Sequence, residues 1–196
     1  MRINEIFYSI QGEGCFSGTP ALFVRMSGCN LRCSFCDTHH TPNTEMSDDE
    51  IIEEMKKLSA TCRHVVITGG EPSLQLTSEL VGKLHLNGYF IQVETNGTHP
   101  LPSGIDWVTC SPKFNYCDNA RLHPDVKVDE LKVVYDGNPS RMEAYRDIEA
   151  RCRSLQPCAT GDDERDKEII NSTVEYVKEN PEWRLSLQTH KLINIP

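Results

Sequence analysis

Short runs of apolar and β-branched residues recur along the chain and predict β-strands. Most of these runs place apolar residues at consecutive positions, as buried parallel strands do. Because they alternate with helical or turn-forming segments, we expect parallel crossovers between them. The predicted strands are Ala21–Met26, His64–Thr68, Tyr89–Glu94, Trp107–Cys110, Glu130–Tyr135, Arg153–Gln156 and Trp183–Gln188.

Helices are predicted where apolar residues repeat on one face. The first begins at a capping box formed by Ser47 and Glu50, and the second ends at Gly88. Two more are predicted over Ser140–Cys152 and Asp166–Asn180. The apolar positions are Ile51, Ile52, Met55 and Leu58 in the first helix, and Leu76, Leu80, Val81 and Leu84 in the second.

The connections between the later strands are less regular. The stretches Gly97–Asp106 and Ser111–Asp129 carry too much proline, glycine, asparagine and aspartate for helices. The predicted fold class is therefore α/β, an incomplete βα barrel resembling part of a TIM barrel, with mostly parallel strands and some crossovers lacking helices. Nearly every chemically suggestive string follows a predicted strand. Because loops at the carboxyl ends of strands build the active sites of such barrels, we expect one site within a single domain, 1–196.

The composition narrows the class of protein. With 38% hydrophobic and 25% charged residues among 196, the chain has the make-up of a globular protein with a core. No apolar run approaches a membrane span, and no signal-peptide segment follows Met1, so we expect a cytoplasmic protein that binds no membrane. A net charge of −9 argues against binding nucleic acid. An anionic small ligand would need a locally basic pocket.

Nine cysteines, an odd number at uneven spacing, do not suit a disulfide framework. Cys29, Cys33 and Cys36 form a Cys-x3-Cys-x2-Cys string, which can hold three irons of one [4Fe–4S] cluster and leave the fourth open. A zinc site completed by His39 or His40, or unrelated buried thiols, are the alternatives. Packed or incidental thiols are expected at Cys15, Cys62, Cys110, Cys117, Cys152 and Cys158, although Cys110, Cys117 and Cys158 could hold a second cluster.

The cysteine string, followed after the next predicted strand by Gly69-Gly70-Glu71-Pro72, resembles the radical S-adenosylmethionine (SAM) superfamily. The resemblance implies that SAM chelates the open iron through its amino and carboxylate groups. An electron from the reduced cluster then cleaves SAM to give a 5′-deoxyadenosyl radical. Glu71 resembles the acid that binds the methionine ammonium group, and the glycines allow close approach of the backbone.

Further strings resemble one family of that superfamily, the 7-carboxy-7-deazaguanine synthases, over essentially the whole chain. These strings are Ser9-Ile10-Gln11-Gly12-Glu13-Gly14, Cys36-Asp37-Thr38, Glu94-Thr95-Asn96-Gly97, Ser111-Pro112-Lys113 and Leu187-Gln188-Thr189-His190-Lys191. The resemblance implies contraction of 6-carboxy-5,6,7,8-tetrahydropterin to 7-carboxy-7-deazaguanine with loss of ammonia, a step toward queuosine and related deazapurines. It also implies Mg²⁺, a flavodoxin- or ferredoxin-type electron donor and a homodimer.

The resemblance assigns substrate contacts to several residues. Arg25 lies in an otherwise apolar strand, so an inward guanidinium would need an anion such as the pterin carboxylate; an ion-paired or outward arginine is the alternative. Gln188 and His190 alternate along the last predicted strand and would face one side. Pro196 would place its α-carboxylate against the pterin, with a frayed tail as the alternative. The other expected substrate contacts are Ile10, Gln11, Gly12, Glu13 and Thr95.

The same resemblance assigns metal and cofactor contacts, with no acid or base among the side chains. Thr38 matches the Mg²⁺ ligand. Its hydroxyl is a hard oxygen donor, and substrate oxygens and waters would complete the octahedral shell of the ion. A capping threonine is the alternative. The expected cofactor contacts are Phe35, Asp37, Gly70, Glu71, Gly97, Ser111, Pro112, Lys113, Gln156, Pro157, Cys158 and Ala159.

Two other classes of protein share the cysteine string. One is a radical SAM activase that installs a glycyl radical on a partner protein. The strings at Gln11–Glu13 and Gln188–His190 argue against it. The other is an iron–sulfur electron carrier or a zinc-binding module, which would not cleave SAM after reduction.

Overall fold

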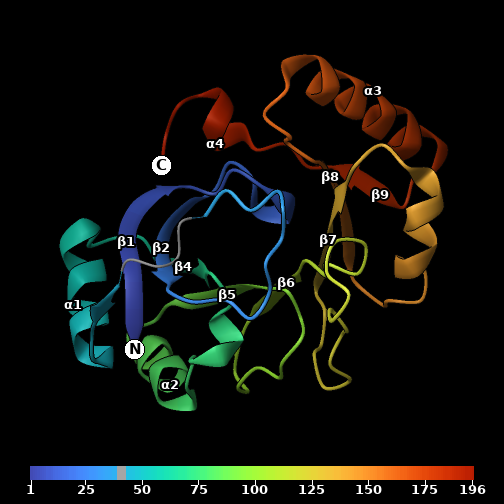
Figure 1. Ribbon diagram of the computed structural model, residues 1–196. Helices are drawn as coiled ribbons and strands as arrows, with labels where there is room; N and C mark the ends of the chain where they lie inside the picture. Colours follow the sequence, from blue (N-terminus) through green and yellow to red (C-terminus); the bar gives the residue numbers. More distant parts are fainter. Residues whose placement is uncertain (39–42) are drawn as a thin grey trace.

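A nine-stranded sheet forms the centre of the molecule within residues 1–38 and 43–196, the parts that the computed structural model describes (Figure 1). Its order is β3-β1-β2-β4-β5-β6-β7-β8-β9. β1 is antiparallel to β2 and β3, and every pairing from β2 to β9 is parallel. The strands are β1 Arg2–Ile10, β2 Pro20–Met26, β3 Thr44–Glu45, β4 His64–Gly69, β5 Phe90–Thr95, β6 Trp107–Cys110, β7 Glu130–Tyr135, β8 Cys152–Pro157 and β9 Trp183–Leu185.

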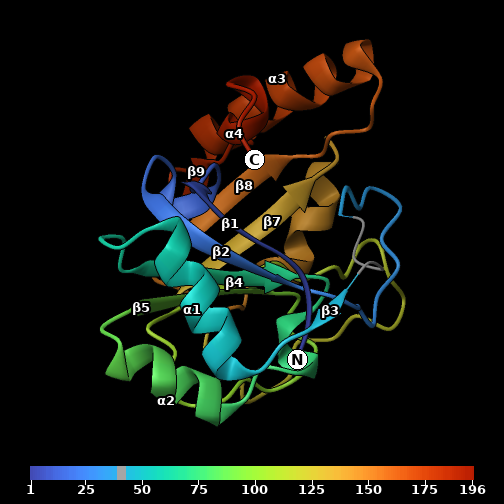
Figure 2. The same cartoon turned by 90° about the vertical axis from the view of Figure 1, so that its left-hand side faces the viewer.

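The helices lie outside this sheet. Figures 1 and 2 show α1 and α2 beside β1, β2, β4 and β5, and α3 beside β8 and β9. The predicted capping box of Ser47 and Glu50 begins α1, which is confirmed. The helices are α1 Asp48–Leu58, α2 Ser78–Leu86, α3 Asp163–Glu179 and α4 Thr189–Leu192, with 3₁₀ turns η1 Gly14–Phe16, η2 Pro72–Leu74 and η3 Pro139–Tyr145.

Alternation along the strands separates an apolar outer face from a polar inner face. Outward residues such as Leu131 and Val133 of β7 join the core beneath the helices. A second apolar cluster of β2, β4 and β5 packs against α1 and α2. On the inner face, the Thr109 hydroxyl donates to Glu130 at 3.0 Å and the Ser154 hydroxyl donates to the same carboxylate. On β6, β7 and β8 the interior is thus lined by hydrogen-bonded polar side chains, whereas Phe7, Ala21, Phe23 and Val66 of β1, β2 and β4 form a small apolar cluster.

The predicted fold class is confirmed in its main features. The parallel strands and outer helices form an α/β structure, and the sheet is open because β3 and β9 are its edges. The crossovers 96–106 and 111–129 contain no helix, as the composition of these stretches predicted. β1 was not predicted, because polar residues interrupt its apolar residues and leave no continuous apolar run.

Two predicted elements were wrong. The helix expected over Ser140–Cys152 is the short 3₁₀ segment η3, after which the chain passes into β8. Its buried residues Met142 and Tyr145 are three apart, the spacing that a 3₁₀ helix places on one side. The strand expected to run to Gln188 ends at Leu185, so Gln188 and His190 belong to the start of α4 rather than to one strand face.

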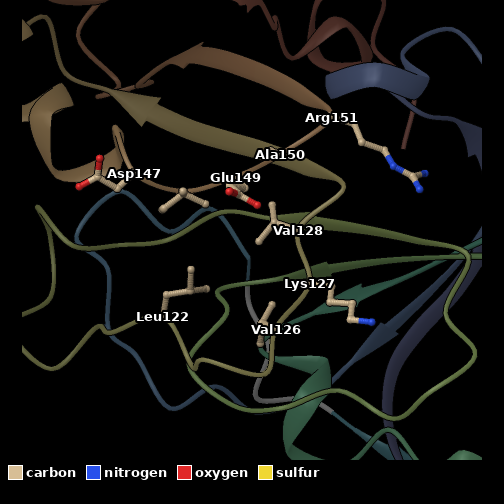
Figure 3. A pocket seen from close by; sticks show the side chains of 9 residues that line it. Leu122, Val126, Lys127, Val128, Asp147, Glu149, Ala150 and Arg151 are labelled. Atoms are coloured by element: carbon tan, nitrogen blue, oxygen red, sulfur yellow. The ribbon is translucent and has the colours of Figure 1, made fainter.

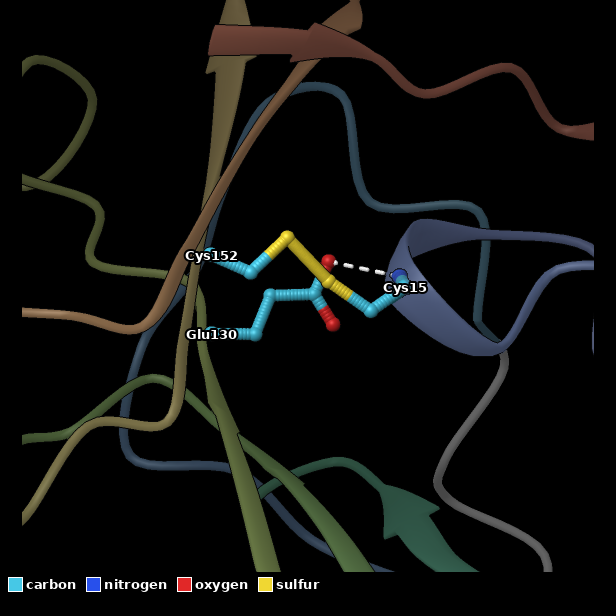
Figure 4. A group of neighbouring side chains, drawn as sticks. All are labelled: Cys15, Glu130 and Cys152. Carbon is cyan, nitrogen blue, oxygen red and sulfur yellow. Dashed lines mark hydrogen bonds between the residues drawn. A yellow bond between two sulfur atoms is a disulfide. The ribbon is translucent and has the colours of Figure 1, made fainter. Parts of the chain in front are cut away.

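The loop between β1 and β2 fastens to the opposite side of the open barrel. The ring of Phe16 makes edge-on contacts with Trp107 at 5.1 Å and with Phe90 at 5.6 Å. Cys15 forms a disulfide with Cys152 at the start of β8 (Figure 4). The expectation of an unpaired thiol at these two cysteines was therefore wrong: the loop brings together residues 137 positions apart, which no spacing rule foresees.

Candidate functional site

One cavity of about 620 Å³ gathers residues from the carboxyl ends of the strands. Its walls come from the loops after β2, β4, β5, β6 and β8, the segment after β1, and the residues around α4. Parallel strands bring these distant segments to one edge of the sheet. The predicted residues that line the cavity are Ile10, Gln11, Gly12, Glu13, Arg25, Cys29, Cys33, Phe35, Cys36, Asp37, Thr38, Gly70, Thr95, Ser111, Lys113, Gln156, Pro157, Cys158, Ala159, Gln188, His190 and Pro196.

Three predicted cofactor residues, Glu71, Gly97 and Pro112, are not part of this lining. Glu71 is fully buried, and its carboxylate accepts from the Thr95 hydroxyl at 2.6 Å and the Asn96 amide at 2.7 Å. It also accepts from a backbone amide of η2 at 3.0 Å. Glu71 therefore ties the loop after β4 to the loop after β5, beside the cavity.

The predicted cluster ligands lie on the loop after β2. Cys29, Cys33 and Cys36 are free thiols that all line the cavity. Burial raises the pKa of the Cys29 thiol, and raises that of Cys33 to about 12. A Cβ on Gly70 would lie 1.9 Å from the Gly28 carbonyl oxygen, so glycine lets this loop rest against the end of β4.

The loop after β6 packs against the cysteine loop. The ring of Phe35 meets that of Tyr116 edge-on at 4.5 Å, and the Lys113 ammonium group lies 5.8 Å from the Phe35 ring centre. The sulfur of Cys117 lies 3.7 Å from that of Cys33. Burial lowers the pKa of Lys113. This wall therefore offers an aromatic ring and a cation close to the three thiols.

The sequence also left two alternative metal sites open, a zinc site and a second cluster. His39 and His40, the ligands considered for zinc, lie outside the described residues. Among residues 1–38 and 43–196, one compact group of potential ligands is found, formed by Cys15, Glu130 and Cys152 (Figure 4). The two sulfurs of that group are bonded to each other, which occupies them. Cys110, Cys117 and Cys158 form no such group within the described part of the chain.

A charged network lies deeper in the cavity. The Lys132 ammonium group donates to Glu13 at 2.6 Å and to Glu94 at 2.7 Å. Gln188 donates to the other oxygen of Glu13 at 2.8 Å, and Gln11 donates to the other oxygen of Glu94 at 2.9 Å. Burial alone would raise the pKa of Glu13, but the charge and hydrogen bond of Lys132 hold it at about 2. Both carboxylates are thus presented as acceptors.

Lys132 is a cavity residue that no expectation from the sequence covered, and Glu94 was expected only as part of the Glu94-Thr95-Asn96-Gly97 string, with no role of its own. Lys132 stood in Glu130–Tyr135, a run interpreted as a buried strand. The usable signal was alternation: Glu130 and Lys132 share one face of β7, and that face is opposite the apolar core. A charged pair at alternate positions of a buried strand needs partners inside the protein.

Arg25 lines another wall of the cavity. Its guanidinium donates to Glu5 of the neighbouring strand at 2.7 Å and lies 5.7 Å from the ring centre of Phe7. Phe7 stacks on Phe23 at 4.8 Å. Arg25 is therefore both ion-paired and turned toward the cavity, which combines the two orientations considered for it. A flat, anionic ligand would find aromatic surface and a cation here.

The C-terminal residues close the side of the cavity. The Thr189 amide donates to the Gly12 carbonyl at 3.0 Å, and a Cβ on Gly12 would lie 2.1 Å from the His190 ring. Lys191 forms an ion pair with Asp37, which outweighs burial and lowers the pKa of that carboxyl. An oxygen of the Pro196 α-carboxylate accepts from a serine hydroxyl of β1 at 2.8 Å. The tail is thus fastened to the cysteine loop and to β1.

A second cavity of about 600 Å³ lies at the opposite ends of the later strands (Figure 3). Its lining comes from the stretches before β7 and before β8, and it includes Lys127, Asp147 and Arg151. None of the residues predicted for the site lines it.

Comparison with known proteins agrees with the site. Residues 23–113 match the Radical SAM superfamily. A 7-carboxy-7-deazaguanine synthase of Bacteroides thetaiotaomicron is 50% identical over 194 residues, covering 99% of this chain and 98% of that protein. One from Haemophilus influenzae is 37% identical, covering 99% and 93%. The crystal structure of QueE from Escherichia coli aligns with a TM-score of 0.77 at 30% identity, covering 95% of this chain and 92% of that one.

The open parallel barrel and the three-cysteine loop at its cavity define a radical SAM enzyme, whose chemistry uses a [4Fe–4S] cluster and SAM. Within that superfamily, the chain belongs to the 7-carboxy-7-deazaguanine synthase family. The resemblance seen in the sequence is thereby confirmed. Among the described residues, no helix has both the length and the apolar character needed to cross a membrane.

Proposed function

We propose that this enzyme contracts 6-carboxy-5,6,7,8-tetrahydropterin to 7-carboxy-7-deazaguanine, releasing ammonia, in 7-deazapurine biosynthesis of the queuosine type. The observation that supports this best is a single cavity lined by three free thiols, an anionic hydrogen-bonding network and an arginine. A polar heterocycle with a carboxylate complements such a cavity. The names of the full-length relatives point to the same product.

Cys29, Cys33 and Cys36 would hold three irons of the cluster, and the residues present fit it. Their thiols are unpaired, line one cavity and lie on a loop that Gly70 allows to approach the sheet. When bound, SAM and the cluster supply the radical that removes a hydrogen atom from the substrate. The proposed SAM contacts in the cavity are Phe35, Asp37, Gly70, Ser111, Lys113, Gln156, Pro157, Cys158 and Ala159. Glu71, Gly97 and Pro112 would support these contacts from behind the lining.

The protein itself binds and orients the substrate. Arg25 would receive the pterin carboxylate, and the phenyl rings beside it would cover the flat bicycle. The carboxylates of Glu13 and Glu94 would accept N–H groups of the heterocycle. Holding the reacting C–H bond in place and excluding water are the main catalytic tasks left to the side chains. The further substrate contacts we propose are Ile10, Gln11, Gly12, Thr95, Gln188, His190 and Pro196.

Thr38 lines the cavity and would supply an oxygen ligand to Mg²⁺, with substrate oxygens and waters completing the shell. We further propose a homodimer in the cytoplasm that receives electrons from a flavodoxin- or ferredoxin-type donor. The Mg²⁺ proposal is supported by the place of Thr38 in the cavity lining, and the others are supported by family membership.

Anaerobic turnover tests the proposed function. Reconstituted enzyme with reductant, SAM and the tetrahydropterin is expected to release ammonia and a product with the mass of 7-carboxy-7-deazaguanine. Cys33→Ala is expected to lose the visible absorption of the cluster and all SAM cleavage, whereas Cys62→Ser, at a free thiol outside the cavity lining, is expected to keep both. SAM cleavage by the wild type without conversion of the pterin, and with a radical formed on a partner protein, would instead identify an activase.

A further inference from the structure

We propose that Lys132 is a positioning residue that holds the Glu13 and Glu94 carboxylates together as an anionic pair, and that this pair selects heterocycles presenting adjacent N–H donors. The inference rests on the proposed function, and it adds a residue and a specificity rule to it. Lys132 comes from β7, Glu94 from β5, and Glu13 from the loop after β1. One ammonium group therefore joins three separate elements at the cavity.

The contacts of Lys132 at the cavity wall are with these two carboxylates. Its side chain is 6% exposed, and its ammonium group lies 2.6 Å from Glu13 and 2.7 Å from Glu94. Two carboxylates so close to one point would repel each other without a cation between them. Burial alone would lower the pKa of Lys132, but the charges of the two carboxylates outweigh it and raise this pKa above its ordinary value. The three groups carry one net negative charge, which remains for the ligand.

The orientation of the carboxylates is also fixed from their outer sides. Gln188 donates to Glu13 and Gln11 donates to Glu94, each to the oxygen that Lys132 does not contact. Gln156 also donates to Glu13, at 3.4 Å. An ionised carboxylate has only acceptor positions, about four per group, so at least one position remains on each carboxylate. The edge of a ligand that contacts this carboxylate pair must therefore carry hydrogen-bond donors. The 2-amino group and the adjacent ring N–H of a pterin form such an edge.

This arrangement predicts discrimination against a matched analogue. The 2-oxo analogue of the substrate, a pteridine-2,4-dione with the same carboxylate, places a carbonyl oxygen where the pterin has its amino group. That oxygen would face a carboxylate, and a site built around hydrogen bonds rejects such a partner strongly. We expect the wild-type holoenzyme to bind the 2-amino compound at least about 100-fold more tightly than the 2-oxo compound.

Lys132→Met and Lys132→Arg test the role of the ammonium group in the reconstituted holoenzyme. Lys132→Met is expected to raise KM for the tetrahydropterin about 30-fold or more; the iron bound per chain is measured beside it, so that only cluster-loaded protein is compared. The 2-amino over 2-oxo preference, measured as a ratio of inhibition constants, is expected to fall about 10-fold. Lys132→Arg keeps the charge and is expected to restore most of the preference. Lys127→Met, at an exposed lysine outside this cavity, is the matched control.

The outcomes separate the two proposals. A wild type that neither binds nor converts the pterin contradicts the proposed function. A wild type that does both, with Lys132→Met unchanged in KM and in preference, contradicts the positioning role alone. If Lys132→Met fails to fold or to hold its cluster, Lys132→Arg and Glu13→Gln decide: an unchanged preference in Glu13→Gln overturns the inference, and a reduced one supports it.

Discussion

At the scale of single residues, the contact between Gly70 and Gly28 holds the cysteine loop against the sheet. A methyl group at position 70 would lie 1.9 Å from the Gly28 carbonyl oxygen and 2.4 Å from its carbon, and both are backbone atoms. Gly70→Ala is therefore expected to destabilise the protein by about 1–3 kcal/mol and to lower the iron bound per chain. Urea unfolding and iron analysis measure these effects.

The matched control is Gly82→Ala. Gly82 lies in α2 with no atom within 4 Å of an added Cβ, so alanine is expected to raise the free energy of unfolding by about 0.5–1 kcal/mol. Equal stability and iron content in Gly70→Ala and the wild type would show that the loop does not depend on this close approach.

The hydroxyl of Thr38 is the residue-scale feature on which the Mg²⁺ proposal depends. Thr38→Ala is expected to raise the Mg²⁺ concentration for half-maximal activity roughly 10-fold or more, because the metal loses one oxygen donor. The iron content is expected to stay unchanged, since no thiol is altered. Activity titrated with Mg²⁺, beside Thr61→Ala as an exposed control, measures this. A variant that keeps the wild-type Mg²⁺ response would show that Thr38 is not a Mg²⁺ ligand.

The family resemblance named most of the cavity residues, and the position of most strings after predicted strands indicated that they converge on one site. The sequence could not show what each side chain faces. Glu71, expected to meet the cofactor, also has protein partners that the sequence did not indicate, since its carboxylate accepts from Thr95 and Asn96. Lys132 was overlooked because it stands in an apolar run, although its inward position depends only on the two-residue period of a strand.

At the scale of elements, η1 is fastened across the open barrel by the Cys15–Cys152 disulfide. Reducing the disulfide frees η1, which is adjacent to Glu13. It also removes a cross-link between distant residues, and such a cross-link stabilises the folded protein because it restricts the unfolded chain strongly. We expect dithiothreitol to lower the free energy of unfolding of the wild type by about 2–5 kcal/mol. Cys15→Ser is expected to start at the lower value and not to respond. Cys62→Ser is expected to respond like the wild type.

Element boundaries were predictable where local signals define them. The capping box at Ser47 marks the start of α1 within the sequence itself. The ends of β9 and η3 depend on tertiary packing instead: Trp183 is buried against the core of β7 and β8, but the chain turns away after Leu185. Apolar residues spaced three apart in η3 suit a 3₁₀ turn as well as an α-helix, so periodicity alone could not decide.

At the scale of the whole molecule, a protein with a net charge of −9 keeps one buried cation between two carboxylates. The expectation that the ends of parallel strands form one converging site agrees with the cavity found there. The pairing itself joins β5, β7 and the loop after β1. Such long-range combinations follow from the register of the sheet, which the sequence pattern does not specify.

The same network makes stability depend on pH. The pKa of Glu13 falls from an ordinary 4.5 to about 2 in the folded protein, so its contribution is complete above pH 4.5 and is lost as pH falls toward 2. The pKa of Lys132 lies above its ordinary 10.5, so that contribution is complete below pH 10.5 and is lost only at higher pH. Glu13→Gln is expected to cost on the order of 3 kcal/mol above pH 4.5, and this difference from the wild type should vanish as pH approaches 2. Urea unfolding across this pH range measures the difference in free energy of unfolding. Glu54→Gln, in an exposed ion pair, is the control, and its difference from the wild type is expected to be near zero. A Glu13→Gln difference that stays constant with pH would mean that Glu13 is not held ionised by Lys132.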